Sequence, residues 1–156
     1  MTVEQLLFVS FDRRGDQFVG LLPVEAALTV ADDPEGLLCK AATAYGRSVW
    51  KMRVIVTEIE SVRSSRQPIP ARMVWDLGDL VFRLRNALAN LSLQVDDLYG
   101  HLVRDIGVPQ KRLEKVVTLR RYVPKRTLIP KDLNWGRCEK GTRTVAERLS
   151  KEQPAR

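Results

Sequence analysis

The chain of 156 residues contains only two cysteines, Cys39 and Cys138, and one histidine, His101. Because there is no CxxC pair and no Cys/His cluster, a structural zinc site is excluded and a disulfide framework is not expected. No apolar run approaches the roughly 20 residues that a membrane-spanning helix needs. The first residues also lack the basic start of a signal peptide. These absences predict a reduced, cytoplasmic protein that does not enter a membrane.

Sequence signatures of common catalytic and nucleotide-binding sites are also missing. There is no GxGxxG, Walker or GxSxG motif, and the nine glycines are scattered rather than gathered in a phosphate-binding loop. Neither cysteine has the neighbours that mark a nucleophile, and His101 stands without a Ser or Cys motif beside it. We therefore expect no catalytic residues, no metal site and no cofactor.

The charge of the chain is unevenly distributed. Hydrophobic residues make up 44% of the sequence, enough to form a core at this length. Residues 1–103 carry 11 Lys and Arg against 13 Asp and Glu, whereas residues 104–156 carry 15 against 6. A basic C-terminal third on a nearly neutral body is typical of a surface that binds phosphate groups. A solubilising tail is the alternative interpretation.

The N-terminal segment, residues 1–33, predicts a small β-hairpin. Residues 4–11 are rich in aromatic and β-branched side chains, residues 12–16 have the composition of a turn, and residues 17–24 are apolar again. Residues 28–30 form a candidate third short strand.

Residues 34–92 predict a long antiparallel helical hairpin that serves as a scaffold or a dimerisation unit. Apolar side chains recur at alternating spacings of three and four in two heptad runs, which is the pattern of packed helices. A link containing Pro68 and Pro70 separates the runs, so the helices should fold back on each other. The runs are Leu38, Ala42, Tyr45, Val49, Met52, Val56 and Ile59, then Val74, Leu77, Val81, Leu84, Leu88 and Leu91.

Residues 93–150 have the pattern of a helix-turn-helix followed by a basic extension. Asp96 and Asp97 suit the first turn of one helix, Gly107 supplies the turn, and Pro109 opens the next helix. With Gly107 as the turn glycine, the packing positions are all apolar: Leu102, Ile106, Val108, Leu113 and Val116. The solvent-facing positions of the second helix are all polar: Gln110, Lys111, Arg112, Glu114, Lys115 and Thr118.

This pattern predicts a helix that enters the major groove of DNA, with an apolar back and a front of hydrogen-bond donors. Val103 departs from it, because Ala or Gly usually occupies that position. Gln110 and Arg112 are the candidates for base edges. The phosphate candidates are Lys111, Lys115, Arg120 and Arg121, and Thr118, Lys125 and Arg126 complete the predicted nucleic-acid-binding set. The alternative is that these residues form a solvated helix face.

The basic extension is expected to be partly extended and partly helical. Pro124 and Pro130 favour extended chain, a last helix is predicted over residues 137–149, and residues 151–156 should fray. Trp135 is predicted as a core anchor, with stacking on a base as the alternative.

Three short blocks together resemble a known module. They are residues 75–78 (Trp-Asp-Leu-Gly), residues 113–124 (ending in Leu-Arg-Arg-Tyr-Val-Pro) and residues 133–136 (Leu-Asn-Trp-Gly). A similar order occurs in the helix-turn-helix N-terminal domain of a family of PDDEXK-type nucleases, over about residues 70–140. No PD…(D/E)xK catalytic set is present here. The resemblance therefore implies nucleic-acid binding without cleavage.

Residues 77–82 are similar to the second motif helix of the MazG-like nucleotide pyrophosphohydrolases, all-α enzymes that hold Mg²⁺ between an ExxE and an ExxD helix. Asp76 and Asp79 have the spacing that puts two carboxylates on one helix face. The preceding helix offers Glu58 and Glu60, which point to different faces, so the first motif is broken. The other interpretation is that the two aspartates lie on a solvated helix face or pair with Arg72 and Arg83.

The sequence favours a mainly α, non-enzymatic DNA-binding protein, a helix-turn-helix regulator or accessory factor of a bacterial or mobile-element system. RNA is not excluded as the ligand. A homodimer formed through the heptad runs is expected, because helix-turn-helix proteins usually bind as two-fold dimers. Apolar residues outside the runs, among them Trp50, Ile55 and Leu80, indicate burial against the hairpin or a second copy of the chain.

Two alternative functions remain open at this point. One is a basic helical-bundle subunit of a larger protein–nucleic acid complex, which would hold the nucleic-acid backbone without reading its sequence. The other is a degenerate MazG-like nucleotide pyrophosphohydrolase.

Overall fold

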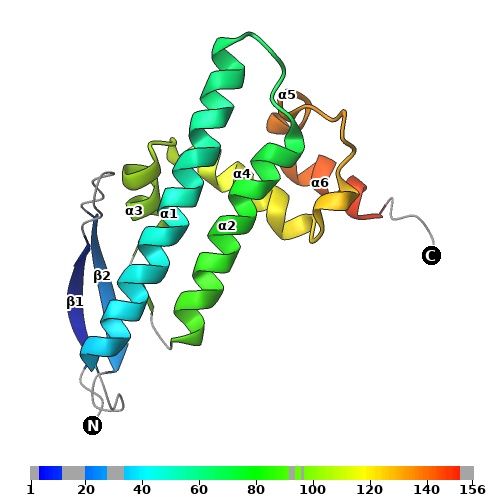
Figure 1. The fold of residues 1–156 in the computed structure, drawn as a ribbon. Helices are drawn as coiled ribbons and strands as arrows, with labels where there is room; N and C mark the ends of the chain where they lie inside the picture. The colour runs from blue at the N-terminus through cyan, green and yellow to red at the C-terminus, as the bar shows by residue number, and fades with distance from the viewer. Residues whose placement is uncertain (1–3, 12–19, 28–33, 92–93, 96, 152–156) are drawn as a thin grey trace.

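The protein is mainly helical in the computed structural model (Figure 1). The structure describes residues 4–11, 20–27, 34–91, 94–95 and 97–151. Strand β1 (Glu4–Phe11) pairs antiparallel with β2 (Gly20–Ala27), which also pairs with β3 (Gln94–Val95). The predicted turn and the candidate strand at 28–30 lie outside the described residues, and the N-terminal hairpin as a whole stays a prediction. Across the described ranges, no helix has both the length and the apolar character needed to span a membrane.

Two long helices, α1 (Pro34–Ser64) and α2 (Ala71–Asn90), run antiparallel and side by side (Figure 1). Most side chains of the two heptad runs are buried inside the chain: Tyr45, Val49, Met52 and Ile59 from α1, and Val74, Leu77, Val81, Leu84 and Leu88 from α2. The runs are therefore already packed against the chain's own elements. The buried side chains of the runs are not available to a second copy of the chain, and the dimer that the sequence led us to expect stays a prediction.

Helices α3 (Leu98–Ile106) and α4 (Gln110–Tyr122) follow, joined at Gly107. Gly107 has a φ of 72°, in the left-handed region that favours glycine, and its N–H donates to the carbonyl of Val103 at 3.0 Å. This confirms the predicted turn glycine. The five predicted packing positions are buried as well: Leu102, Ile106, Val108, Leu113 and Val116.

The last part of the chain contains the short 3-10 helix η1 (Arg126–Leu128), α5 (Trp135–Glu139) and α6 (Thr142–Lys151). The prediction of one helix over residues 137–149 is wrong. The helix is interrupted at Gly141. The N–H of Gly141 donates to the carbonyl of Cys138 at 3.3 Å, and the hydroxyl of Thr142 donates to the same carbonyl at 2.9 Å. Trp135 is 3% exposed, which confirms it as a core anchor and leaves no ring face for a base.

The regions predicted as a scaffold and as a helix-turn-helix share a single hydrophobic core. Helix α4 packs against both α2 and α6, and α3 packs against α1 and α4. At Gly78 the backbones of α2 and α4 come so close that a Cβ would lie 2.7 Å from the carbonyl oxygen of Val116. The indole N–H of Trp75 donates to the carbonyl of Val123 at 2.7 Å. Helix α4 is therefore fixed along its length to α2.

The three blocks that carry the nuclease-module resemblance meet around the start of α2. The first block contacts the second through the Gly78 approach and the Trp75 hydrogen bond. The third block joins the residues before and at the start of α2, where the N–H of Trp135 donates to the carbonyl of Ile69 at 2.7 Å. The N–H of Ala71 donates in turn to the carbonyl of Leu133 at 2.9 Å. These motifs thus hold the helices together.

Candidate nucleic-acid interface

Helix α4 has one buried side and one side that faces solvent. The buried side carries Leu113, Val116, Val117 and Leu119. The opposite side, which we call the α4 polar face, consists of Gln110, Lys111, Glu114, Lys115, Thr118, Arg121 and Tyr122, all exposed or half-buried. Residues three and four apart lie on one face of a helix, so Lys111, Lys115 and Thr118 form a continuous polar line.

The α4 polar face carries positive charge that is not neutralised by ion pairs within the described part of the chain. Lys111, Lys115 and Arg121 make no ion pair with any described residue. Lys111 and Lys115 are one helical turn apart, about 6 Å along the axis. Glu114 is the only carboxylate of α4, and it accepts a hydrogen bond from the Gln110 side-chain amide at 3.4 Å. The face therefore presents three cations beside one oriented amide–carboxylate pair.

Arg120, predicted as a phosphate contact, lies on the other side of α4. Its Nε donates to Asp79 Oδ1 at 2.9 Å. Its guanidinium carbon lies 5.3 Å from the ring centroid of Trp75 and 4.8 Å from that of Phe82. A guanidinium paired through Nε and stacked in this way is directed toward the aromatic rings and the carboxylate of α2. Arg120 thus fastens α4 to α2, and the phosphate role predicted for it does not fit this geometry.

Arg112, predicted as a base contact, is turned toward α1 and is half-buried. It lines a small cavity of about 20 Å³ with Glu60 and Arg63 of α1. The spacing of Arg112 from Leu119, seven residues, places it at the edge of the buried side. Its position separates it from Gln110, the other residue predicted to contact a base edge.

Lys125 and Arg126, beyond the end of α4, are both exposed but differ in their partners. Lys125 makes no ion pair with any described residue, whereas Arg126 Nε lies 2.9 Å from Asp76 Oδ1. Of the nine predicted residues, the structure brings Gln110, Lys111, Lys115, Thr118 and Arg121 onto one face. Lys125 extends the basic sequence past its end, Arg120 and Arg126 pair with aspartates of α2, and Arg112 lies toward α1.

The aspartates of the pyrophosphohydrolase resemblance are held by arginines. Asp79 pairs with Arg83 at 2.9 Å in addition to Arg120, and Asp76 pairs with Arg126. The sequence offered Arg83 as a partner, which is confirmed, whereas Arg72 instead donates to the carbonyl of Ile129 at 2.7 Å. Among the described residues, no group of three or more His, Cys, Asp and Glu side chains is arranged to hold a metal ion.

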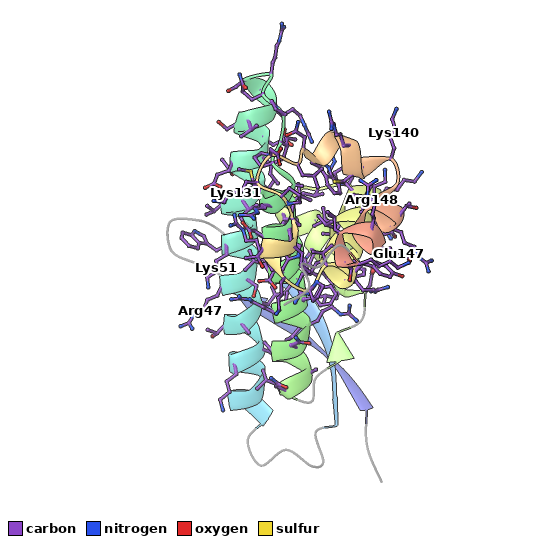
Figure 2. All side chains as sticks on the ribbon, turned by 90° about the vertical axis from the view of Figure 1, so that its right-hand side faces the viewer. Arg47, Lys51, Lys131, Lys140, Glu147 and Arg148 are labelled. Atoms are coloured by element: carbon purple, nitrogen blue, oxygen red, sulfur yellow. The ribbon has the colours of Figure 1, made fainter. Side chains whose placement is uncertain are left out.

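Helix α6 adds cations beside α4 that the predicted site omitted. The Arg143 guanidinium carbon lies 5.5 Å from the ring centroid of Tyr122, and Arg143 also pairs with Glu147 at 3.1 Å. Figure 2 shows Lys140 and Arg148 on the same side of the molecule as Glu147. The signal for these residues was available, because the basic composition continues beyond residue 126 to the end of the chain.

No family model, curated protein or solved structure matches this chain. The functional argument therefore rests on the side chains and their surroundings.

A buried polar cluster joins α1 to α3, and nothing in the sequence pattern indicated it. The hydroxyl of Tyr45 donates to Asp105 Oδ2 at 2.5 Å, and Arg104 donates to both carboxylate oxygens at 2.9 and 3.2 Å. Arg53 Nε donates to the Asp105 carbonyl at 2.7 Å. Burial, and then the hydrogen bond to Asp105, raise the pKa of Tyr45. The cluster fixes the position of the helix that precedes α4.

The Cys138 thiol is buried, and burial raises its pKa. A thiol with a raised pKa and no access to solvent is a poor nucleophile. Cys138 therefore contributes to packing between α5 and its neighbours.

Proposed function

We propose that this protein is a non-enzymatic DNA-binding protein and that it uses the α4 polar face, as a regulator or accessory factor. The observation that carries the proposal is that Lys111 and Arg121 are exposed and Lys115 is half-buried, without ion pairs in the described part of the chain, on a helix whose other side is buried. Three cations on one face of a helix, with Glu114 as the one carboxylate of that helix, suit phosphate oxygens.

In the proposed complex the two ends of the α4 polar face have different tasks. Gln110, at the start of α4, offers amide donors and an acceptor to a base edge in the major groove. Lys111, Lys115 and Arg121 contact the phosphates and displace the counterions that surround DNA. The phosphate contacts supply most of the affinity, and Gln110 supplies the discrimination between bases.

A rigid support strengthens this proposal, because a helix that reads base edges must keep its orientation. The close approach at Gly78, the Trp75 hydrogen bond and the Arg120–Asp79 ion pair fix α4 to α2 at three points. The cost of ordering α4 has thus been met before DNA binds.

A second candidate function is a subunit that holds a nucleic-acid backbone without reading its sequence. Cations beyond α4 favour it, because Arg137 of α5 and Lys140, between α5 and α6, are both exposed. The pyrophosphohydrolase alternative gains nothing from the geometry, since Asp76 and Asp79 already have arginine partners.

The proposal is tested by fluorescence anisotropy with a random-sequence duplex at about 50 and about 200 mM salt. The variant Lys111→Ala/Lys115→Ala/Arg121→Ala is compared with a control, Lys40→Ala/Lys51→Ala/Arg63→Ala. Both remove three cations, but the control residues lie on α1. We expect the first variant to lower the slope of log affinity against log salt by about 3, at roughly 0.9 per phosphate contact. The control should retain the wild-type slope.

Equal losses in the two triple variants would contradict the assignment to α4, as would an absence of binding at the lower salt concentration. Sequence reading is tested separately, by selection from the random pool. A preference of about a thousandfold or more for a selected duplex supports a regulator. Equal affinity for all duplexes, with competition by single-stranded RNA, supports the backbone-binding subunit.

A further inference from the structure

The outer side of α1 carries an apolar pair between two opposite charges. Trp50 is 38% exposed and Val54 is 42% exposed, which are high values for such side chains in a folded protein. Arg47 precedes the pair and Glu58 follows it. Their spacings of three, four and four residues put all four side chains on one side of the helix. We call Arg47, Trp50, Val54 and Glu58 the α1 outer stripe.

A groove of about 380 Å³ lies next to the α1 outer stripe, between α1 and α2. Its apolar lining comes from Trp50, Val54, Ile55 and Leu80, and Lys51, Asp76, Asp79 and Arg83 surround it. The groove widens the apolar surface beyond the two exposed side chains. It gives a large side chain from outside a place to bury its surface.

The charges of the α1 outer stripe complement the same stripe when its direction is reversed. Arg47 is positive at one end and Glu58 is negative at the other, about 16 Å apart along the helix axis. Lys51, also exposed, lies beside Trp50 and Val54 at the groove. The side chains of Arg47 and Glu58 are exposed, and neither makes an ion pair with the described residues. A second copy running antiparallel would bring opposite charges together at both ends. A parallel copy would bring like charges together.

We propose that two copies of the chain associate through the α1 outer stripe, antiparallel, about a two-fold axis near residue 52. Trp50 then packs beside Val54 of the second copy, and Arg47 lies within one residue of the position opposite Glu58 of the second copy. Because the axis is two-fold, each contact occurs twice. The buried side chains of the heptad runs, which are most of those runs, take no part in this interface.

This assembly leaves the α4 polar face open and does not depend on whether the protein binds nucleic acid. In Figure 2, Arg47 and Lys51 project from one edge of the molecule, whereas Glu147 and Arg148 of α6 lie at the opposite side. A dimer formed on the outer side of α1 therefore has its basic C-terminal parts directed outward.

The first test is the mass of the protein by sedimentation equilibrium without nucleic acid, from about 1 to about 300 µM. We expect the wild type to reach the dimer mass within this range. Val54→Glu should raise the dimer dissociation constant at least about tenfold, because it places two carboxylates in the apolar centre. Circular dichroism checks that Val54→Glu stays folded, as its 42% exposure leads us to expect. A wild type that remains monomeric at about 300 µM would overturn the proposal.

The second test reverses the charges. Arg47→Glu and Glu58→Arg should each weaken association about tenfold, since each replaces two attractive pairs by repulsive ones. The double variant and the equimolar mixture of the two single variants should both recover wild-type association. Arg137→Glu on α5 makes the same charge change as Arg47→Glu and should have no effect. Association that is insensitive to the single reversals, as a parallel pairing predicts, would overturn the antiparallel dimer.

Discussion

At the scale of single residues, Gly78 decides how closely α2 and α4 pack. A Cβ at this position would lie 2.7 Å from the Val116 carbonyl oxygen and 2.9 Å from Arg120 Cβ. Neither atom is the free end of a flexible side chain, so the helices themselves would have to separate. Glycine lowers helix stability by about 1 kcal/mol relative to alanine. The buried glycine is therefore explained by close packing.

Gly78→Ala should destabilise the protein by about 1–3 kcal/mol, because strain between α2 and α4 outweighs the gain in helix propensity. Gly136→Ala is the matched control, since nothing lies within 4 Å of its added Cβ and Gly136 is also in a helix. The control should leave stability unchanged or raise it slightly. Urea unfolding of both variants measures the two effects. Equal stability of Gly78→Ala and wild type would contradict the close approach.

Tyr45 gives the protein a dependence on alkaline pH. Burial and the hydrogen bond to Asp105 raise its pKa above the ordinary value of 10.0. The unfolded chain releases this proton at lower pH than the folded protein does. Stability should therefore fall as pH rises above about 10, with a slope of up to about 1.4 kcal/mol per pH unit.

The variant Tyr45→Phe isolates this effect. At neutral pH it should cost about 1–3 kcal/mol, because the buried carboxylate of Asp105 loses a donor. Between about pH 9 and about pH 11 its stability should fall less steeply than that of the wild type. Urea unfolding across this pH range compares the two proteins. Parallel curves would show that Tyr45 does not hold its proton in the folded state.

At the scale of secondary-structure elements, α4 combines two tasks on its opposite sides. Arg120 fastens the helix to α2, whereas Lys111 faces solvent. Both are cations of one helix, so removing either changes the net charge equally. Their variants therefore separate support from binding.

Arg120→Ala should lower stability by about 1–3 kcal/mol through the loss of stacking and of an ion pair that is partly shielded from solvent. It should leave the salt dependence of DNA binding by the folded protein unchanged. Lys111→Ala should leave stability within about 0.5 kcal/mol of wild type. It should lower the slope of log affinity against log salt by about 1. Thermal unfolding and anisotropy on the same samples provide the comparison. If Arg120→Ala instead lowered the slope of log affinity against log salt by about 1, Arg120 would contact a phosphate after all.

The elements themselves were largely predictable from local patterns. Heptad spacing located α1 and α2 because each buries one side. The φ requirement of Gly107 located the turn between α3 and α4. The interruption at Gly141 was not predicted from the sequence. Val145 and Leu149 have helical spacing on their own, but this spacing does not indicate where their helix begins. A glycine between two polar residues was the available signal.

The candidate site was less predictable, because it depends on contacts between residues far apart in the sequence. Helical spacing separates a polar from an apolar side of α4, but it does not determine whether a cation at the border between them faces solvent or the protein. Arg120 is turned inward because it pairs with Asp79 and stacks on Trp75 and Phe82 of α2. Asp105 is buried because Tyr45, sixty residues earlier, donates to it. Such pairings have no periodic signature.

At the scale of the whole molecule, the neutral body and the basic third form a single core. Side chains from α1, α2, α3, α4, α5 and α6 belong to one hydrophobic cluster. The basic residues of the C-terminal third are therefore carried by helices that belong to this core. Any surface that these residues form has a fixed position relative to α1 and α2. A boundary near residue 92, drawn from the change in charge, separates regions of different chemistry that share one packing unit.

The bridge between Pro70 and Asn134 has a consequence for the order of events on the ribosome. These residues are 64 positions apart, so at about 5–20 residues per second the partner of Pro70 is made roughly 3–13 seconds later. Throughout this interval the start of the nascent α2 lacks residues 133–136, which hydrogen-bond to it and carry the buried Trp135. A chaperone that recognises exposed apolar helices can bind during this interval. The interval ends when residues 133–136 leave the exit tunnel.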